Sequence, residues 1–352
     1  MMLQRNRIIK TRDKQTRQQL TILMLGFACV SAPISASPAP SAQADVSTVQ
    51  AEINRIAAPV GGEIGVATWR LDGHGPHVLV NADKSFPMAS TFKIAVAGAL
   101  FAKVDRGELA LDHMLAVPPA AYVESEIIAD ALPHPGVSLS LHNLIDLMLT
   151  RSDNTATDVL TATAGGPETV TAWVRKQGVT GLRVDRDTAG IVRDFFGLPK
   201  GTFSEALAKA RQADPKLDSR GEHPNPAFDD DPRDSSTPTA MGELLTRIFN
   251  GQALSPQSTA ALTAIMEHCH TSDKRLRAWL PEKTTVADKT GTLGGSVNDV
   301  GVITLPDNKG QFVIAVFIKK SDQPFEARES VIASIGRAVY DFFLFARAAK
   351  TE

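Results

Sequence analysis

The sequence predicts an α+β fold, in which an antiparallel sheet built from N- and C-terminal strands is covered by helices and adjoins an all-helical lobe. Two observations predict it. Runs rich in β-branched residues lie near both ends of the chain, and the part between them has the apolar periodicity of helices. The composition, with 43% apolar and 22% charged residues, is that of a folded chain with a sizeable core.

The expected strands are short, and turn-forming residues bound them. They are rich in valine and isoleucine or alternate between apolar and polar residues, and Gly, Pro or an Asp-Asn pair separates them. We expect strands at 63–71, 78–81, 286–288, 300–305 and 312–318. Because these strands come from both ends of the chain, we expect the two ends to meet in one sheet.

The expected helices lie mostly between these strands. Apolar residues recur there at helical spacing. We expect helices at 91–106, 139–151, 154–164, 167–177, 239–250, 256–268 and 330–349. The helical lobe would span roughly residues 92–240, and a cleft between the two lobes would hold the site.

Residues 197–233 interrupt the helical pattern. The segment holds five prolines and the acidic run 229–231. We predict a long loop with one helix at 204–212. Loops of this length are functional lids or disordered segments.

The first 44 residues are predicted to be a signal peptide. Basic residues are followed by the apolar run 20–30 and by Ala42-Gln43-Ala44, a small-residue cleavage site. We therefore expect cleavage near Ala44, export to the periplasm and a mature domain at 45–352. The apolar run is shorter than the ~20 residues that span a bilayer, so we expect no stable membrane anchor. Cys269 would be the only cysteine left, which excludes an intramolecular disulfide.

Charge and residue types exclude several function classes. A net charge of -2 without a basic stripe gives no footprint for nucleic acid. His268 and His270 flank Cys269, but a zinc site needs three or four converging ligands, and the sequence offers no further cluster. We expect no metal, no cofactor and a monomeric protein that acts on a small molecule.

The first chemical motif is Ser90-x-x-Lys93. A serine hydroxyl attacks poorly unless a base takes its proton, and a lysine one helical turn away lies on the same face. A buried lysine loses its charge readily and can be that base. The spacing alone is more typical of a helix cap beside a surface lysine. Here the apolar run 94–100 follows, so both residues are expected at the start of a buried helix.

Two further motifs follow in order. Ser-Asp-Asn stands at 152–154, after an expected helix, and Lys-Thr-Gly-Thr stands at 289–292, after an expected strand. Each motif alone is compatible with a turn or an edge strand. The three together are the known signature of class A β-lactamases and penicillin-binding proteins.

The chain resembles class A β-lactamases over nearly the whole of residues 45–352. Besides the three motifs, the resembling segments are 151–160, 165–167, 184–186, 231–238, 275–281 and 298–300. The resemblance implies a β-lactamase/DD-peptidase-like fold. It also implies hydrolysis of a β-lactam, a cyclic amide, through an acyl-enzyme.

The resemblance implies a role for each motif residue. Ser90 would be the nucleophile, Lys93 a proton acceptor, and Ser152 the relay to the leaving nitrogen. The oxyanion hole would consist of the backbone N–H groups of Ser90 and Thr292. The residues implied at the substrate, with Asn154 on its amide side chain and the others at or near its carboxylate, are Asn154, Arg275, Lys289, Thr290, Gly291 and Thr292.

One loop departs from the family pattern. Thr188 stands where the resemblance predicts the glutamate that activates the deacylating water. General-base help is worth ~100- to 10,000-fold, so without a substitute the acyl-enzyme would persist. Asp187 is our first choice as a surrogate base. The other carboxylates that stay open are Glu124, Glu126, Asp194, Glu205 and the run 229–231.

Three function classes are therefore open. The chain is a β-lactamase, a DD-peptidase or other amide hydrolase on the same scaffold, or a β-lactam-binding protein that is acylated once. We favour the β-lactamase because Arg275 and the segment 298–300 match the class A pattern. The loop at Thr188 keeps the other two open.

Overall fold

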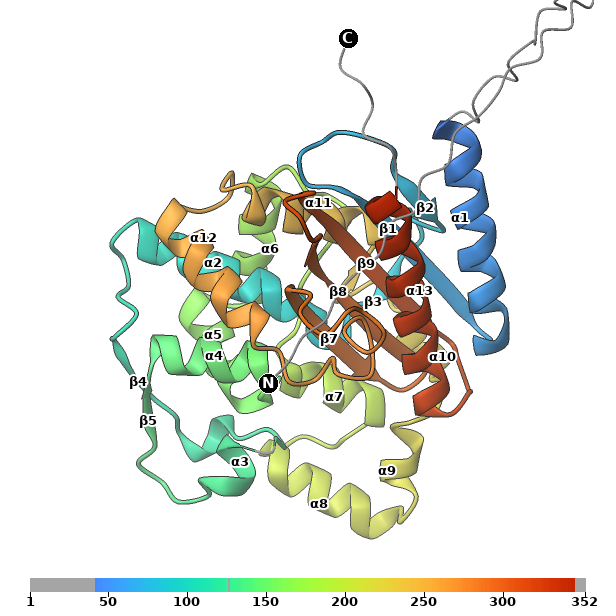
Figure 1. Ribbon diagram of the computed structural model, residues 1–352. Helices are drawn as coiled ribbons and strands as arrows, with labels where there is room; N and C mark the ends of the chain where they lie inside the picture. Colours follow the sequence, from blue (N-terminus) through green and yellow to red (C-terminus); the bar gives the residue numbers. More distant parts are fainter. Residues whose placement is uncertain (1–41, 126, 346–352) are drawn as a thin grey trace, which may run out of the picture. The chain divides into compact units, whose positions relative to one another are not determined.

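A five-stranded antiparallel sheet is central to the fold (Figure 1). The computed structural model describes residues 42–125 and 127–345. In spatial order the strands are β2 (Val78–Val80), β1 (Glu63–Arg70), β9 (Gln311–Lys319), β8 (Ser296–Thr304) and β7 (Val286–Leu293). Glu63 lies opposite Lys319 and Arg70 opposite Phe312, so the first strand pairs with the last. The prediction of one sheet from both chain ends is confirmed.

The sheet is buried on both faces. Even-numbered residues of β9, from Phe312 to Ile318, pack in an apolar layer with α1 (Ala42–Ala57) and α13 (Phe325–Phe345). Odd-numbered residues, from Val313 to Phe317, belong to the layer that contains α11 (Pro238–Phe249). This alternation is the period-two pattern of a strand, and it places the helical lobe against one face only.

The helical lobe is built around α2 (Lys93–Asp105), whose residues from Lys93 to Ala102 are all buried. The helices that pack against α2 are α4 (Leu141–Thr150), α5 (Asn154–Ala164), α6 (Pro167–Lys176) and α12 (Pro256–Glu267). Gly98 allows α6 to approach closely, because a Cβ there would lie 2.2 Å from the ring of Trp173. α12 joins this lobe although it lies beyond the expected range 92–240.

Short elements connect the larger ones. They are η1 (Ala58–Val60), η2 (Ala89–Phe92), η3 (Pro119–Ala121), α3 (Ile128–Ala131) and two small sheets, β3 (Phe86–Pro87) with β6 (Ser235–Ser236) and β4 (Met114–Ala116) with β5 (Ser138–Ser140). The backbone N–H of Met88 also donates to Asp234 O at 3.0 Å. The β3–β6 pair therefore anchors the chain just before Ser90.

An ion pair joins the beginning and the end of the long segment between α6 and α11. Arg186 Nε donates to Asp234 Oδ2 at 2.6 Å, and the backbone N–H of Asp185 donates to Asp234 Oδ1 at 2.7 Å. Between Arg186 and Asp234 the chain forms four helices, α7 (Thr188–Phe196), α8 (Phe203–Ala213), α9 (Leu217–Arg220) and α10 (Pro226–Asp229). α8 confirms the helix predicted at 204–212, whereas α7, α9 and α10 were not predicted.

The helices near the two ends of the described residues differ from the prediction. α1 was not expected, and α13 begins at Phe325 rather than at Ser330. Arg328 and Glu329 are buried inside α13, and these charged residues hide its apolar pattern in the sequence. The expected leader, residues 1–44, lies almost wholly outside the described residues. Among the helices that are described, none is long and apolar enough to span a membrane.

Candidate active site

Ser90 lies in the 3-10 turn η2, directly before α2. Two strands hold this turn in place. Asn298 of β8 donates through Nδ2 to Met88 O at 3.1 Å. A Cβ on Gly291 of β7 would lie 3.0 Å from Ser90 N and 2.5 Å from Met88 O, so glycine permits this close approach. The preceding Ala89 has a φ of 44°, a conformation that such packing must maintain.

Lys93 follows Ser90 by one turn and is fully buried. Its Nζ lies 2.8 Å from Ser152 O, 3.1 Å from Ser152 Oγ and 2.9 Å from Asn154 Oδ1. Burial, and then the nearby charge of Lys289, hold the pKa of Lys93 well below its ordinary value. The two carbonyl oxygens only accept hydrogen bonds, whereas the Ser152 hydroxyl can also donate. A neutral amine, with two hydrogens and one lone pair, satisfies all three partners.

Ser152 lies between two lysines. Lys289 Nζ, from β7, is 3.0 Å from the same Ser152 Oγ that Lys93 contacts. Lys289 is fully buried, and burial lowers its pKa to about 8. Ser152 has a φ of 58° at the junction of α4 and α5. The next residue, Asp153, caps α5 by accepting the backbone N–H of Ala156 at 2.7 Å, which fixes this sharp turn.

The rest of the Lys-Thr-Gly-Thr motif lies along β7. The hydroxyl groups of Thr290 and Thr271 share a hydrogen bond. Arg275 is only 3% exposed, and its Nε lies 3.2 Å from Glu329 Oε1. Its Nη2 donates to Thr292 Oγ1 at 2.6 Å. Arg275 therefore orients the Thr292 hydroxyl and brings positive charge to this end of β7.

Thr188, which stands at the position of the expected glutamate, is the first residue of α7. Asp187 is the N-cap of this helix, and its Oδ1 accepts the backbone N–H of Gly190 at 2.7 Å. Asp158 of α5 accepts the backbone N–H groups of Thr188 and Ala189 at 2.6 and 2.9 Å. Burial, and then the charge of Asp187, raise the pKa of Asp158 to about 7. Two carboxyl groups therefore lie at the N-terminus of α7.

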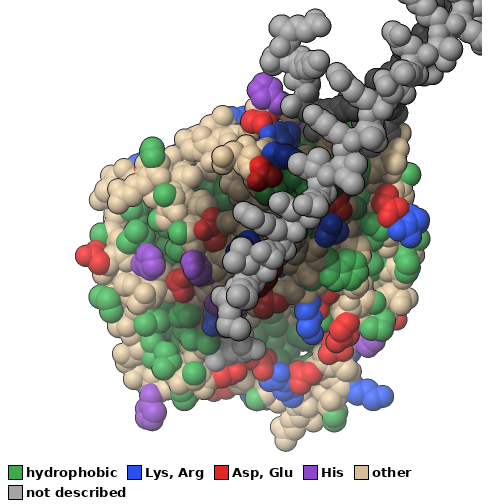
Figure 2. Space-filling model, viewed as in Figure 1, with side chains coloured by type: hydrophobic (Ala, Val, Ile, Leu, Met, Phe, Trp, Pro, Cys, Tyr) green, Lys and Arg blue, Asp and Glu red, His purple; other side chains and the backbone are tan. Residues whose placement is uncertain are grey.

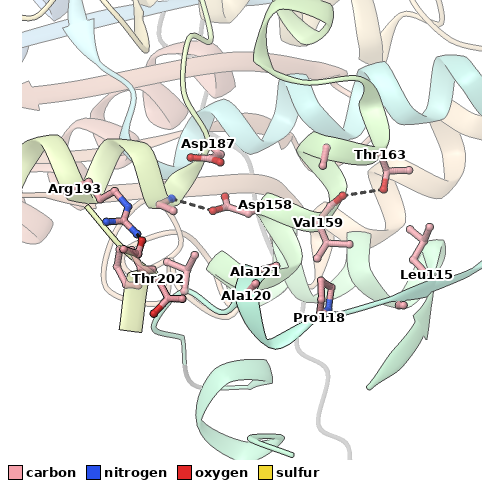
Figure 3. A pocket seen from close by; sticks show the side chains of 16 residues that line it. Leu115, Pro118, Ala120, Ala121, Asp158, Val159, Thr163, Asp187, Arg193 and Thr202 are labelled. Carbon is pink, nitrogen blue, oxygen red and sulfur yellow. Dashed lines mark hydrogen bonds between the residues drawn. The ribbon is translucent and has the colours of Figure 1, made fainter. Parts of the chain in front are cut away.

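These two carboxyl groups line a pocket of about 450 Å³ (Figure 3). Arg193 lies at one end of it and Leu115 at the other, with Asp187 and Asp158 between them. Ser90, Lys93 and Lys289 are not among its lining residues. The pocket is thus distinct from the group that surrounds Ser152 Oγ.

Most of the alternative carboxylates are engaged elsewhere. The shortest ion-pair distances are 2.9 Å for Glu124 with Arg211, 2.6 Å for Asp194 with Arg186, 2.7 Å for Asp231 with Arg233 and 2.7 Å for Asp230 with Lys320. Glu205 is exposed at the start of α8. Asp229 is buried, and burial raises its pKa to about 6. Glu126 lies outside the described residues.

The structure brings most of the expected site residues together. Hydrogen bonds join Lys93, Ser152, Asn154 and Lys289, and Gly291 brings β7 against Ser90. We call Ser90, Lys93, Ser152 and Lys289, which the resemblance predicts to act in acylation or in substrate binding, the catalytic cluster. Asp187 has no hydrogen bond to it among the bonds of the described residues.

Sequence reasoning missed two site features. Asp158 lies one helical turn after Asn154 on α5, and this spacing was the available signal. The backbone oxygen of Glu124 accepts Asn154 Nδ2 at 2.9 Å. The sequence carries no local signal for that contact.

Three comparisons place the chain among known proteins. A family model described as the beta-lactamase enzyme family matches residues 48–343. β-Lactamase Toho-1 of Escherichia coli is 29% identical over 84% of this chain and 89% of its own length. β-Lactamase VEB-1 of Pseudomonas aeruginosa is 28% identical over 86% and 92%. The solved structure of an ancestral Gram-negative class A β-lactamase is 32% identical, with a TM-score of 0.68, over 83% of this chain and 99% of that one.

Proposed function

The chain belongs to the beta-lactamase enzyme family, in its class A, and we propose that it hydrolyses β-lactams through an acyl-enzyme on Ser90. The observation that carries this proposal is the meeting of Lys93 and Lys289 at Ser152 Oγ. It supplies a neutral base beside the nucleophile and a hydroxyl that can pass a proton onward. Both are needed to open a cyclic amide.

In the acylation step, Ser90 Oγ attacks the lactam carbonyl while Lys93 Nζ takes its proton. The new C–O bond gives a tetrahedral intermediate with an oxyanion, and collapse of this intermediate breaks the C–N bond. The leaving nitrogen receives its proton from Ser152, which Lys93 then reprotonates. The backbone N–H groups of Ser90 and Thr292 stabilise the oxyanion, a contribution of ~2.7 to 4 kcal/mol per donor. The close approach of β7 at Gly291 supports this placement.

The substrate carboxylate binds at the end of β7. Lys289 carries the charge, and the hydroxyl groups of Thr290 and Thr292 supply hydrogen bonds. Arg275 acts at this site by fixing Thr292 Oγ1 at 2.6 Å. Asn154 binds the amide side chain of the substrate on the opposite side of the catalytic cluster.

Deacylation needs a carboxylate to deprotonate one water, and we propose Asp187 for this step. It directly precedes Thr188, which occupies the expected glutamate position. Its use as the N-cap of α7 engages Oδ1, and among the described residues no hydrogen bond engages Oδ2. The alternative is the carboxyl of Asp158 on α5, which accepts the backbone N–H groups of Thr188 and Ala189.

Thr188 also favours a second candidate function, that of a β-lactam-binding protein whose Ser90 is acylated and then loses the acyl group slowly. A hydroxyl does not bind a proton usefully at neutral pH, so it cannot replace the glutamate. The third class, a DD-peptidase, uses the same acylation chemistry on a peptide.

We further propose that residues 1–44 are a signal peptide cleaved near Ala44 and that the mature domain acts as a monomer in the periplasm. The basic start, the apolar run 20–30 and the small residues 42–44 support this. Mass spectrometry of protein secreted by a bacterial host tests it. A mature N-terminus far from Asp45 would contradict it.

One experiment separates the three activities. The protein is mixed with a penicillin, and intact mass is followed in time while a chromogenic cephalosporin reports turnover. A β-lactamase gains the mass of the penicillin and loses it again, with steady turnover of the cephalosporin. A binding protein keeps the added mass after one burst. A DD-peptidase shows the burst and also cleaves a peptide that ends in D-Ala-D-Ala. No mass gain together with no turnover of the cephalosporin would contradict the acyl-enzyme.

A further inference from the structure

We propose that Arg211 is a positioning residue that holds Asn154 through Glu124, and that residues 198–233 act as a strap joining both sides of the catalytic cluster. This inference rests on the proposed function of that cluster. It assigns a role to the segment that the sequence leaves as a long loop.

The first attachment of the strap is on the helical side. Arg211, on α8, donates from Nη2 to both carboxylate oxygens of Glu124 at 2.9 Å, and from Nε to Asp218 at 3.0 Å. Glu124 in turn accepts Asn154 Nδ2 at its backbone oxygen, and Asn154 Oδ1 contacts Lys93 Nζ. A line of direct contacts therefore runs from the strap to the base.

An apolar contact supports this attachment. The buried residues Val123, Phe203, Leu207 and Leu217 form a small core of their own. Val123 directly precedes Glu124, and its backbone N–H donates to Thr155 Oγ1 at 3.0 Å. α8 and α9 thus hold the 123–124 backbone against the start of α5.

The second attachment is on the sheet side, two residues beyond Thr292. The backbone N–H of Gly294, in the β7–β8 turn, donates to Gly221 O at 2.9 Å. Arg328, which is 2% exposed, donates to Gly294 O at 2.8 Å and to Glu222 O at 3.1 Å. A Cβ on Gly294 would lie 2.9 Å from His223 O, so the strap backbone packs directly on this turn.

The two attachments differ in how much they contribute to the stability of the fold. Arg328 is buried, and its loss would leave backbone oxygens unpaired, so it serves folding as well as position. Arg211 and Glu124 have side chains 40% and 51% exposed. A pair this exposed contributes little to stability.

Figure 2 shows basic and acidic side chains side by side on the lower part of the face, where α8 and α9 lie. Arg211 can therefore be changed without unfolding the protein.

The test measures acylation of the full chain by a penicillin, by intact mass, at low and at saturating concentration. We expect Arg211→Ala to weaken penicillin binding by roughly tenfold and to slow the saturated step less, since small misplacements cost up to ~100-fold. Arg211→Lys should restore part of the loss. The pH profile of acylation should shift in Arg211→Ala, because Asn154 contacts the base.

Two further variants keep the test specific. Arg220→Ala, which breaks a surface pair within the same strap at 3.3 Å from Asp214, should acylate like wild type. Glu124→Gln combined with Arg211→Ala should be no worse than Arg211→Ala alone, because both act through one contact. Wild-type acylation rates and an unchanged pH profile in Arg211→Ala would overturn the inference. Absence of acylation in the wild type would instead contradict the proposed function.

Discussion

Lys93 and Lys289 meet at one oxygen: their Nζ atoms lie 3.1 and 3.0 Å from Ser152 Oγ. Two charged ammonium groups so close together, out of water, would repel each other strongly. Burial lowers the pKa of both, well below the ordinary value for Lys93 and to about 8 for Lys289. The pair is thus divided into Lys93, the proposed base, which loses its charge readily, and Lys289, a cation near its titration point.

The first prediction concerns the nucleophile. Ser90→Ala should abolish covalent labelling by penicillin, because Ser90 is the proposed nucleophile, whereas Ser152, the other serine of the catalytic cluster, has the proposed role of a relay between the two lysines. Intact-mass spectrometry after incubation with penicillin measures this. The matched control is Ser219→Ala, which changes an exposed serine and should label fully. A labelled Ser90→Ala protein would refute the mechanism.

The second prediction concerns the carboxylate site. Lys289→Ala should raise KM and lower kcat/KM by the ~1.5 to 3 kcal/mol of a charge-assisted hydrogen bond. Steady-state kinetics with a penicillin or chromogenic cephalosporin measures it. Wild-type kinetics in Lys289→Ala would mean that the carboxylate binds elsewhere.

The third prediction follows from the lowered pKa of Lys289. Its positive charge is present below about pH 8 and is lost above it. In the free enzyme, kcat/KM should therefore decline as the pH rises through this value. Lys289→Arg should move that decline to higher pH, since a guanidinium stays charged. An identical alkaline decline in both proteins would assign it to another group.

The fourth prediction concerns deacylation. Asp187→Asn retains a good N-cap for α7, so its effect isolates the carboxylate charge. If Asp187 is the base, this change should lengthen the acyl lifetime by one or more orders of magnitude. If no surrogate acts, Asp187→Asn should do little while Thr188→Glu speeds release. Mass spectrometry of the acyl-enzyme over time distinguishes the two. Fast release that Asp187→Asn leaves unchanged would contradict both.

The fifth prediction concerns stability. Asp158 ionises near pH 3.8 in an unfolded chain, but its pKa in the fold is about 7. Between these values the folded state binds more protons, so the free energy of unfolding falls as the pH rises through this window. Asp158→Asn cannot ionise and should remove this fall, which is on the order of a few kcal/mol. Urea unfolding at the two ends of the window measures it. The same fall in both proteins would place the cause elsewhere.

The sequence predicted the apolar parts of all five strands of the central sheet but not the polar ends of two of them. β7 continues through the Lys-Thr-Gly-Thr motif to Leu293, and β8 begins at Ser296. The motif is polar in sequence, yet Lys289 and Thr290 are buried because their side chains form hydrogen bonds with Ser152 and Thr271. Pattern reasoning cannot find a partner such as Ser152, which lies more than a hundred residues from Lys289.

The same limit applies to the site. The motif residues could be predicted because the groups that act together are close in sequence, as Ser90 and Lys93 are. Asp158 and Arg211 act through contacts with Thr188 and Glu124, which are distant in sequence. Such contacts follow from tertiary packing, and only the folded structure reveals them.

The pairing of β1 with β9 sets an order for biosynthesis. Residues 63–70 emerge early from the ribosome, but their partners at 312–319 are made much later. Until then β1 has only the short β2 beside it, and an isolated hairpin is marginally stable at best. The domain therefore cannot complete its sheet until β9 has been synthesised. A circular permutant that joins the two ends of the domain and opens the chain in an exposed loop would remove this delay, because β9 and β1 would then be close in sequence.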